Sequence, residues 1–178
     1  NGLAFQTARE EFIKSMAAYS VITYLVAIRD RHNGNIMIDD QGHIVHIDFG
    51  FVLDIAPGGI TFERSPFKLT AEMIQVMGGK EDSSPYFFKF QSYCVEAFLV
   101  LRPYSEQLIQ LVEGVKESGL PCFKNPESSI KNLRQRFRLD LDEAEARNFF
   151  SNLVSQSSEN VRTDLYDAYQ SYKNGIPY

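Results

Sequence analysis

Apolar residues return at roughly helical spacing along most of the chain, with one interruption by short β-type runs. Over residues 5–28 this spacing predicts one long, largely buried helix. Its apolar positions are Phe5, Phe12, Met16, Tyr19 and Ile22. Two β-branched runs, 36–38 and 44–49, then flank an acidic turn that ends in Gly42, and this pattern predicts a β-hairpin.

Capping residues mark the remaining helices. Ser, Thr, Asn and Asp accept hydrogen bonds from free N–H groups at a helix start, and glycine favours a helix end. A short helix is expected from Thr70 to Gly78 and Gly79. Ser84 is expected to start a helix over residues 84–101, and Arg102 with Pro103 a helix over residues 102–119. Asn125 with Pro126 starts the next predicted helix. Asp140 and Glu143 resemble a capping box at the start of another, and Asn160 is expected to cap a last helix over residues 160–174. The helix over 102–119 carries the apolar stripe Leu108, Leu111, Val112 and Val115.

Composition suits one domain with a sizeable core, or a piece of a larger protein, because 44% of the 178 residues are hydrophobic. A net charge of −5 gives no global sign of a nucleic-acid surface. Cys94 and Cys122 lack ligand-type spacing, which favours a reduced, intracellular protein. No apolar run reaches transmembrane length, and residues 1–12 resemble neither a signal peptide nor a translation start. We therefore expect the chain to be cut from a longer one.

The candidate chemistry is concentrated in residues 29–50, RDRHNGNIMIDDQGHIVHIDFG. Asp30 precedes Asn35 by five positions, and Asp48 opens an Asp-Phe-Gly word across the hairpin. Because a hairpin reverses the chain, it would bring Asn35 and Asp48 to the same end, where their oxygen atoms can share Mg²⁺. Protein kinases use this spacing to place a carboxylate at the attacking hydroxyl and two ligands at the metal. A chance match of these five letters has a probability on the order of 10⁻⁶ per starting position.

The loop differs from protein kinases because Arg31 and His32 follow the loop Asp instead of preceding it. In this order, DRHNGN and then HIDFG resemble the phosphatidylinositol 3- and 4-kinase family, and the resemblance covers essentially the whole chain. Its further words are SMAAYS, PGG, PFKLT, VMGGK, GLPCF and the terminal NGIPY. Together they resemble the C-terminal lobe of the type III phosphatidylinositol 4-kinases, most of all the alpha form.

This resemblance implies a fold class and its parts. Residues 1–178 would form the C-terminal lobe of the protein-kinase-like (phosphatidylinositol kinase) fold, mainly α with a short β-hairpin. The catalytic loop would span about residues 28–36 and the activation loop about residues 48–70. No Gly-rich loop, phosphate-pairing Lys or adenine hinge precedes Asn1, so the N-terminal lobe is absent from this sequence. The chain would therefore carry half of an active site and be inactive alone.

The resemblance also implies roles for single residues. Asp30 would orient or deprotonate the inositol hydroxyl, and His32 would either support the γ-phosphate or share the role of base. Asn35 and Asp48 would ligate Mg²⁺ and thereby bind ATP. The apolar floor beneath the adenine would consist of Met37 and Ile47.

The activation loop allows an inference about the substrate. Between residues 51 and 69 its basic residues are Arg64 and Lys68 and its acidic residues are Asp54 and Glu63, so the formal charge is two minus two, or zero. Each further phosphate on a lipid headgroup would require paired Arg or Lys donors. With Arg64 and Lys68 as substrate contacts, the loop therefore favours phosphatidylinositol over a more phosphorylated lipid.

The predicted function is transfer of the γ-phosphate of ATP to the 4-hydroxyl of phosphatidylinositol, giving phosphatidylinositol 4-phosphate, with ATP and Mg²⁺ as cofactors. By resemblance, the partners would be phosphatidylinositol in a membrane, the N-terminal kinase lobe with upstream regions of the parent chain, and scaffold proteins, but no nucleic acid. The location would be cytoplasmic and peripheral at the plasma membrane. Three alternatives stay open: a truncated or pseudokinase binding module, a phosphatidylinositol 3-kinase, and a related atypical protein kinase.

Other polar features receive a structural interpretation. His43 and His46 are expected to be hydrogen-bonded residues of the hairpin, and residues 78–80 lack the flanking residues of a phosphate-binding loop. A solvated face, with anionic lipid as the alternative, is expected for Lys131, Arg134 and Arg138. The apolar stripe over residues 161–176 would either pack on the lobe or meet a membrane interface.

Overall fold

A computed structural model describes residues 2–53, 55, 65–79 and 84–174 of the chain, with side chains up to residue 159. Its elements are α1 (Gly2–Val26), β1 (Ile36–Ile38), β2 (Ile44–His46), α2 (Ala71–Val76), α3 (Pro85–Leu101), α4 (Ser105–Glu113), α5 (Pro126–Arg136) and α6 (Glu143–Asn174), with short 3₁₀ turns at Asn33–Asn35, Arg102–Tyr104 and Pro121–Phe123. The fold is therefore mainly helical with one two-stranded antiparallel sheet, as the sequence predicts.

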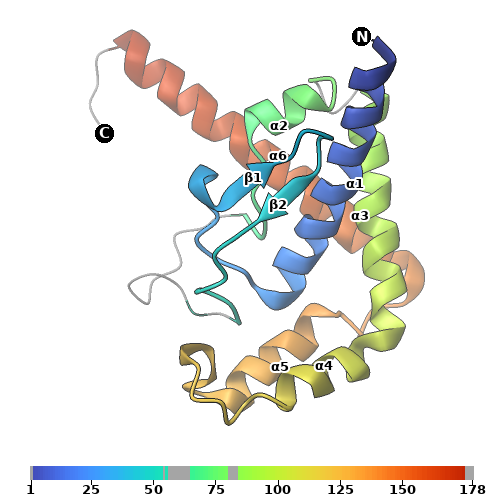
Figure 1. The fold of residues 1–178 in the computed structure, drawn as a ribbon, viewed down its shortest axis with the longest axis vertical. Helices are drawn as coiled ribbons and strands as arrows, with labels where there is room; N and C mark the ends of the chain where they lie inside the picture. The colour runs from blue at the N-terminus through green and yellow to red at the C-terminus, as the bar shows by residue number, and fades with distance from the viewer. Residues whose placement is uncertain (1, 54, 56–64, 80–83, 175–178) are drawn as a thin grey trace.

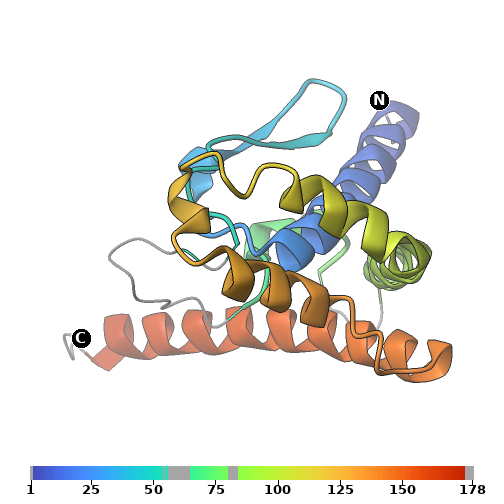
Figure 2. The same ribbon diagram turned by 90° about the horizontal axis from the view of Figure 1, so that it is seen from below.

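The elements form layers around α1. Figure 1 shows α1 and α3 side by side, with the β1–β2 hairpin in front of α1 and α6 crossing behind. The view from below confirms this order, because α6 runs along the side opposite the hairpin (Figure 2). The α4 and α5 helices pack against each other at the lower end of the molecule. The hairpin that carries the candidate site is thus mounted on the central helix.

Aromatic side chains join three helices at the core. The rings of Phe98 in α3 and Phe150 in α6 stack with centroids 4.7 Å apart, and Tyr24 of α1 meets Phe150 edge-on at 5.4 Å. Phe67, which precedes α2, stacks on Phe150 at 6.5 Å. Burial raises the pKa of Tyr24 to about 12, so this phenol stays neutral. The cluster fixes the end of α1, from which the chain enters the candidate site.

The long helix expected over residues 5–28 is present as α1, but two residues of its predicted apolar stripe are exposed. The buried side chains of α1 are Phe12, Ile13, Met16, Ala17, Ser20, Val21, Thr23 and Leu25. Phe5 and Ile22, both counted in the predicted stripe, are exposed. The helix stops at Val26 because Ala27 adopts a left-handed φ of 50°, which ends the α-helical hydrogen-bonding pattern.

Three predicted caps are confirmed. Thr70, Ser84 and Asn125 each accept a hydrogen bond from the backbone N–H three residues on, at the starts of α2, α3 and α5. Gly78 and Gly79 follow α2 with φ values of 96° and 91°, a region that glycine enters without a steric penalty. These two glycines therefore end a helix, as expected, and do not form a phosphate-binding loop.

Two predicted helix starts near the C-terminus are wrong. The capping box is made by Asp142 and Glu145, whose carboxylates accept from each other's backbone N–H at 2.8 and 3.0 Å, and not by Asp140 and Glu143. Asn160 begins no helix, because α6 runs through it without a break. An Asn caps only where the chain enters a helix from an extended conformation, and here the chain is already helical.

The helix expected over residues 102–119 is shorter than predicted. The chain first makes the 3₁₀ turn Arg102–Tyr104, and α4 then ends at Glu113. Of the predicted stripe, Leu108 and Val112 are partly buried against the core, whereas Leu111 and Val115 are exposed by 72% and 50%. The buried residues of α4 are Ser105 and Ile109, so the stripe is correct at Leu108 and Val112 and wrong at Leu111 and Val115.

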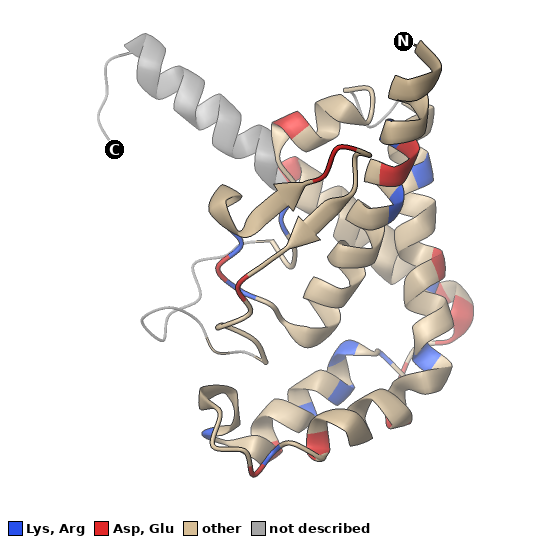
Figure 3. Ribbon diagram, in the orientation of Figure 1, with Lys and Arg blue, Asp and Glu red and all other residues tan. Residues whose placement is uncertain are grey.

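Acidic partners compensate two of the three basic residues expected on one helical face, and Arg138 lies beyond the end of α5 with a φ of 49°. Arg134 pairs with Glu106, and Arg138 pairs with Asp140 at 2.9 Å. Figure 3 accordingly shows both signs of charge on α4 and α5, which fits the solvated face better than the anionic-lipid alternative. The apolar stripe over residues 161–176 lies outside the described side chains. Among the described residues, every helix is too short or too polar to span a bilayer.

Candidate active site

One face of the hairpin is docked on α1. Ile44 and His46 of β2 are buried, and the His46 ring stacks on Tyr19 with centroids 4.2 Å apart. The hydroxyl of Ser15 accepts a hydrogen bond from the N–H of Ile44 at 2.9 Å. At the turn, a Cβ on Gly42 would lie 2.4 Å from a carbonyl oxygen of α1, so only glycine permits this approach. The hairpin is therefore held by close packing rather than by its two strands alone.

The opposite face of the hairpin is apolar and exposed. Met37 pairs directly with Val45 in the register of the two strands, and Ile47 lies two residues beyond Val45. These three side chains therefore share one face. Met37 and Ile47 are exposed by 54% and 39%. The structure thus brings the two residues predicted for the adenine floor onto one accessible surface.

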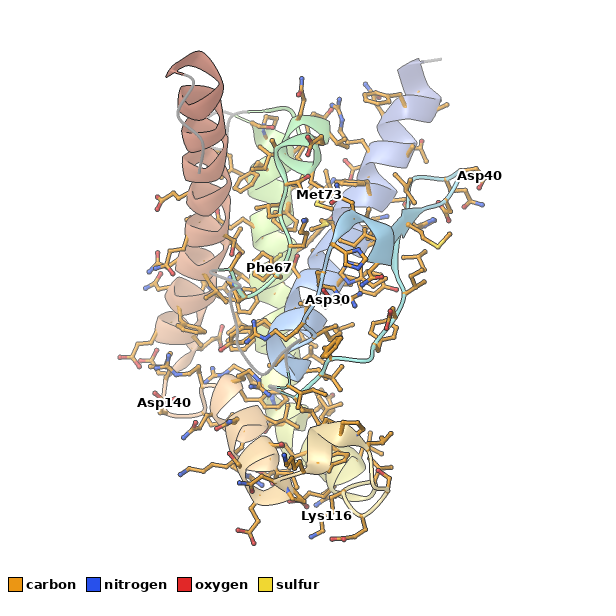
Figure 4. All side chains as sticks on the ribbon, turned by 90° about the vertical axis from the view of Figure 1, so that its left-hand side faces the viewer. Asp30, Asp40, Phe67, Met73, Lys116 and Asp140 are labelled. Carbon is orange, nitrogen blue, oxygen red and sulfur yellow. The ribbon has the colours of Figure 1, made fainter. Side chains whose placement is uncertain are left out.

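The predicted catalytic loop is closed by hydrogen bonds that begin at Asp30. Asp30 is half-buried and has a left-handed φ of 60°. Its carbonyl accepts from the side-chain Nδ2 of Asn35 at 2.8 Å, and Nδ1 of the exposed His32 accepts from the N–H of Gly34 at 3.1 Å. Figure 4 places Asp30 at the base of the hairpin, away from the lower end marked by Lys116 and Asp140.

The two predicted metal ligands lie at the same end of the hairpin. The N–H of Ile47, next to Asp48, donates to the carbonyl of Asn35 at 3.0 Å. Asp48 is exposed and has a φ of 58°, so the chain leaves the strand direction at this residue. Its Oδ1 accepts from the N–H of Gly50 at 3.2 Å. The chain reversal that the sequence predicts is therefore present.

Arg31 connects the predicted catalytic loop to the residues around Asp48, and the sequence analysis predicted no role for it. Its guanidinium donates to the carbonyl oxygens of Arg29 (3.1 Å), Ile47 (2.7 Å) and Asp48, and lies 3.5 Å from that of Asn35. The side chain is only 6% exposed. No sequence pattern distinguishes this Arg from a solvated one. Its acceptors are backbone carbonyls, which every residue has, so the residue types around the site do not reveal them.

The donor atoms at this end of the hairpin fit a hard cation such as Mg²⁺. Asp48 offers a carboxylate, and Asn35 offers an amide oxygen because its Nδ2 is directed to the carbonyl of Asp30. Within the described part of the chain, three or more His, Cys, Asp or Glu side chains do not gather at any one point. Mg²⁺ ions are often bound by one or two carboxylates together with substrate phosphates, and such a site needs no larger protein cluster.

The two hairpin histidines are structural, but the prediction that both are hydrogen-bonded holds for His43 and is wrong for His46, whose buried ring nitrogens have no hydrogen-bond partner among the described residues. Burial, and then the positive charge of Arg31, lower the pKa of His46 to about 4, so its ring is neutral at pH 7. His43 lies 2.8 Å from Asp39 and 3.4 Å from Glu11 of α1. The hydrogen bond to Asp39 and the two negative charges outweigh partial desolvation and raise the pKa of His43. Both side chains secure the hairpin against α1.

The predicted substrate contacts in the activation loop are only partly described. Arg64 lies outside the described residues. Lys68 is half-buried, between Phe67 and Leu69, which are both in the core. The segment that carries Lys68 is thereby anchored just before α2, while its role in binding a headgroup stays a prediction.

Comparison with known proteins places the chain among lipid kinases. Residues 2–125 match the family described as phosphatidylinositol 3- and 4-kinase. The phosphatidylinositol 4-kinase stt4 of Schizosaccharomyces pombe is 58% identical over 100% of this chain, which covers 9% of that protein. The phosphatidylinositol 4-kinase STT4 of Saccharomyces cerevisiae is 51% identical over 99% of this chain and 9% of its own length. For the phosphatidylinositol 4-kinase beta 1 of Arabidopsis thaliana, the identity is 46% over 99% of this chain and 16% of that protein.

The chain belongs to the phosphatidylinositol 3- and 4-kinase family. The resemblance carried by DRHNGN and HIDFG is thus confirmed at the level of the family, and all three relatives just described are named as phosphatidylinositol 4-kinases. The chain spans less than a fifth of the length of each of them. The assignment to the alpha form stays a prediction.

Proposed function

We propose that this chain is the C-terminal lobe of a phosphatidylinositol 4-kinase catalytic domain, and that it carries the catalytic loop and the metal ligands. The observation that carries the proposal is that Asn35 and Asp48 lie at the same end of a hairpin docked on α1. The names of the relatives support the choice of lipid and of the 4-hydroxyl. Phosphoryl transfer relies mainly on positioning and on charge stabilisation, which a rigidly mounted pair of ligands supplies.

The catalytic loop provides the groups that face the attacking hydroxyl. Asp30 orients the inositol hydroxyl and accepts its proton, because a carboxylate at this position is the usual base of the kinase loop. His32 is exposed two residues later, and its Nδ1 is engaged by the N–H of Gly34. With Nδ1 as the acceptor, the neutral ring carries its proton on Nε2, which would donate to the γ-phosphate, and a share in the role of base would require the bond to Gly34 to open first.

Asn35 and Asp48 would hold Mg²⁺ through their oxygen atoms; with ATP as the phosphoryl donor, the bound Mg²⁺ would supply neutralisation of the phosphate charge. Met37, Val45 and Ile47 form the floor beneath the adenine, since an exposed apolar face next to the metal ligands suits a flat aromatic base. A glycine-rich loop and a phosphate-pairing Lys must come from an N-terminal lobe, with which this chain completes the active site.

The substrate is phosphatidylinositol in a membrane. Arg64 and Lys68 are balanced by two acidic residues of the same loop, so the loop offers charge for one phosphodiester and not for additional phosphates. The enzyme works as a peripheral protein at the cytoplasmic face of the plasma membrane, with scaffold proteins as partners. Both the location and the partners rest on the family resemblance alone.

The test uses the full-length gene product that carries this chain, with Mg-ATP and phosphatidylinositol vesicles. The products are separated by phosphate position. Asp48→Asn is compared with Asp140→Asn, an exposed carboxylate in an ion pair away from the hairpin. The proposal expects phosphatidylinositol 4-phosphate from the wild type and Asp140→Asn, and its loss in Asp48→Asn. A 3-phosphate product would overturn the subfamily, and phosphorylation of protein without any lipid product would favour an atypical protein kinase.

A further inference from the structure

We propose that Arg31 is a positioning residue that sets the relative placement of Asn35 and Asp48 by binding backbone carbonyls on both sides of the site. The proposal rests on the proposed function, in which these two side chains hold the metal. Arg31 itself donates to main-chain oxygens, so it acts through the residues whose backbone it holds.

The geometry of the guanidinium suits this task. An Arg presents five N–H donors in one plane, and they diverge in fixed directions. Here Nε reaches the carbonyl of Arg29 at 3.1 Å, Nη1 reaches Ile47 at 2.7 Å, and Nη2 reaches Asp48. The first acceptor belongs to the predicted catalytic loop, and the other two belong to the two residues that directly follow β2. One rigid group therefore spans the two segments that carry the candidate ligands.

Burial makes these bonds necessary. A charged group that leaves water must regain hydrogen bonds inside the protein, and the Arg31 side chain is 6% exposed. The backbone carbonyl oxygens of Arg29, Ile47 and Asp48 provide hydrogen bonds of this kind. The same charge lies 5.7 Å from the centroid of the Phe49 ring, so the residue after Asp48 is also held against Arg31.

Backbone conformation explains why the two loops need support. Asp30 and Asp48 both have positive φ, at 60° and 58°, a region that is sparsely populated by residues other than glycine. Such conformations persist when surrounding contacts hold them. The bond from Arg31 to the carbonyl of Asp48 acts directly at one of these residues. Without it, Asp48 loses a restraint on its positive φ, and its carboxylate, which also accepts from the N–H of Gly50, is held less firmly relative to Asn35.

The chain contains a matched control. Arg102 also donates to three backbone carbonyls, those of Phe137 (3.2 Å), Arg138 (2.7 Å) and Leu141, but these acceptors lie in the connection between α5 and α6. Arg102→Ala removes the same kind of hydrogen bonds as Arg31→Ala. A general loss of stability is therefore separable from a loss of metal-site geometry.

The experiment compares Arg31→Ala, Arg31→Lys and Arg102→Ala in the full-length gene product. The readouts are the apparent affinity for Mn²⁺ in the presence of a non-hydrolysable ATP analogue, measured by electron paramagnetic resonance, the kcat for lipid phosphorylation, and the thermal midpoint. We expect Arg31→Ala to lower Mn²⁺ affinity and kcat by about 10- to 100-fold, as is usual when a group that orients metal ligands is removed. Arg31→Lys keeps the charge but not the planar fork, and stays impaired. Added methylguanidinium restores part of the Mn²⁺ affinity of Arg31→Ala.

Three results would overturn the proposal. They are wild-type Mn²⁺ affinity in Arg31→Ala, full activity in Arg31→Lys, and an equal loss of Mn²⁺ affinity in Arg102→Ala. Failure of the proposed function has a different signature, because the wild-type protein would then bind Mn²⁺ with the nucleotide analogue but give no lipid product that depends on Asp48. If Arg31→Ala does not fold, Arg31→Lys and its Mn²⁺ affinity decide the question.

Discussion

Two arginines at different places in this molecule use the same chemistry. Arg31 binds the carbonyls of Arg29, Ile47 and Asp48, and Arg102 binds those of Phe137, Arg138 and Leu141. Each of them holds a residue with positive φ, Asp48 at 58° or Arg138 at 49°. In both regions a planar cation donates to backbone carbonyls of residues that lie outside helices and strands.

Arg31 and Arg102 differ in the segments of the chain that they join. Arg102 connects the end of α5 to the start of α6, and the nearby Arg138–Asp140 pair is exposed on the surface. Arg31 connects the predicted catalytic loop to the residues that follow β2, and both of these segments carry side-chain oxygen atoms. The comparison teaches that identical hydrogen bonds stabilise a helical corner in one region and orient candidate ligands in the other.

The largest effect should follow from Asn35→Ala. This change removes a candidate metal ligand and the 2.8 Å bond to the carbonyl of Asp30, so turnover of the full-length protein should fall on the order of 10²- to 10³-fold in a lipid kinase assay. The control is Asn125→Ala, which removes the cap of α5 and should cost about 1 kcal/mol of stability with little loss of turnover. Similar turnover in Asn35→Ala and Asn125→Ala would contradict the assignment of Asn35 to the active site.

A smaller effect is expected from Arg102→Ala on stability. Hydrogen bonds from a charged group contribute about 1.5–3 kcal/mol, so the variant should lose roughly 2–3 kcal/mol. In a chain of 178 residues this lowers the thermal midpoint by about 4–10 °C. Thermal unfolding of the chain followed by circular dichroism checks the value. A large loss of Mn²⁺ affinity with an unchanged midpoint would contradict the assignment of Arg102 to stability.

The smallest of these effects is a pH dependence of the folding stability that arises from His46, whose pKa is lowered by burial and in part by the charge of Arg31. His46 has a pKa of about 4 in the fold and an ordinary pKa of 6.5 when unfolded, so the unfolded chain binds its proton first as pH falls. Stability should therefore be full above about pH 6.5 and should decrease by about 2 kcal/mol near pH 5. His46→Phe keeps a ring stacked on Tyr19 and cannot take up a proton. Urea unfolding at both pH values should show a weaker acid loss in His46→Phe than in the wild type, and equal losses would refute this role.

Local signals predicted much of the fold. Thr70, Ser84 and Asn125 cap their helices because a cap depends on residues within one turn. The same local reasoning failed at Asn160, since a residue able to cap does so only where the chain enters a helix, and α6 continues there. Leu111 was misjudged because helical spacing reveals a face but not which neighbours cover it.

In the candidate site, too, features set by nearby residues were predicted and features set by distant residues were not. Asn35 and Asp48 were placed together correctly because a hairpin of known length determines which residues meet. Arg31 received no role, since its acceptors are main-chain carbonyls of residues up to 17 positions away. The exposed face of Met37 and Ile47 was predicted from family resemblance, and the strand register is consistent with it.

The central claim is that Asp48 holds a divalent metal next to the bound nucleotide. The most direct measurement is Mn²⁺ binding to the full-length gene product with a non-hydrolysable ATP analogue, by electron paramagnetic resonance, for the wild type, Asp48→Asn and Asp140→Asn. The account predicts that Asp48→Asn lowers Mn²⁺ affinity by at least about tenfold while Asp140→Asn leaves it unchanged. Wild-type affinity in Asp48→Asn would contradict the account.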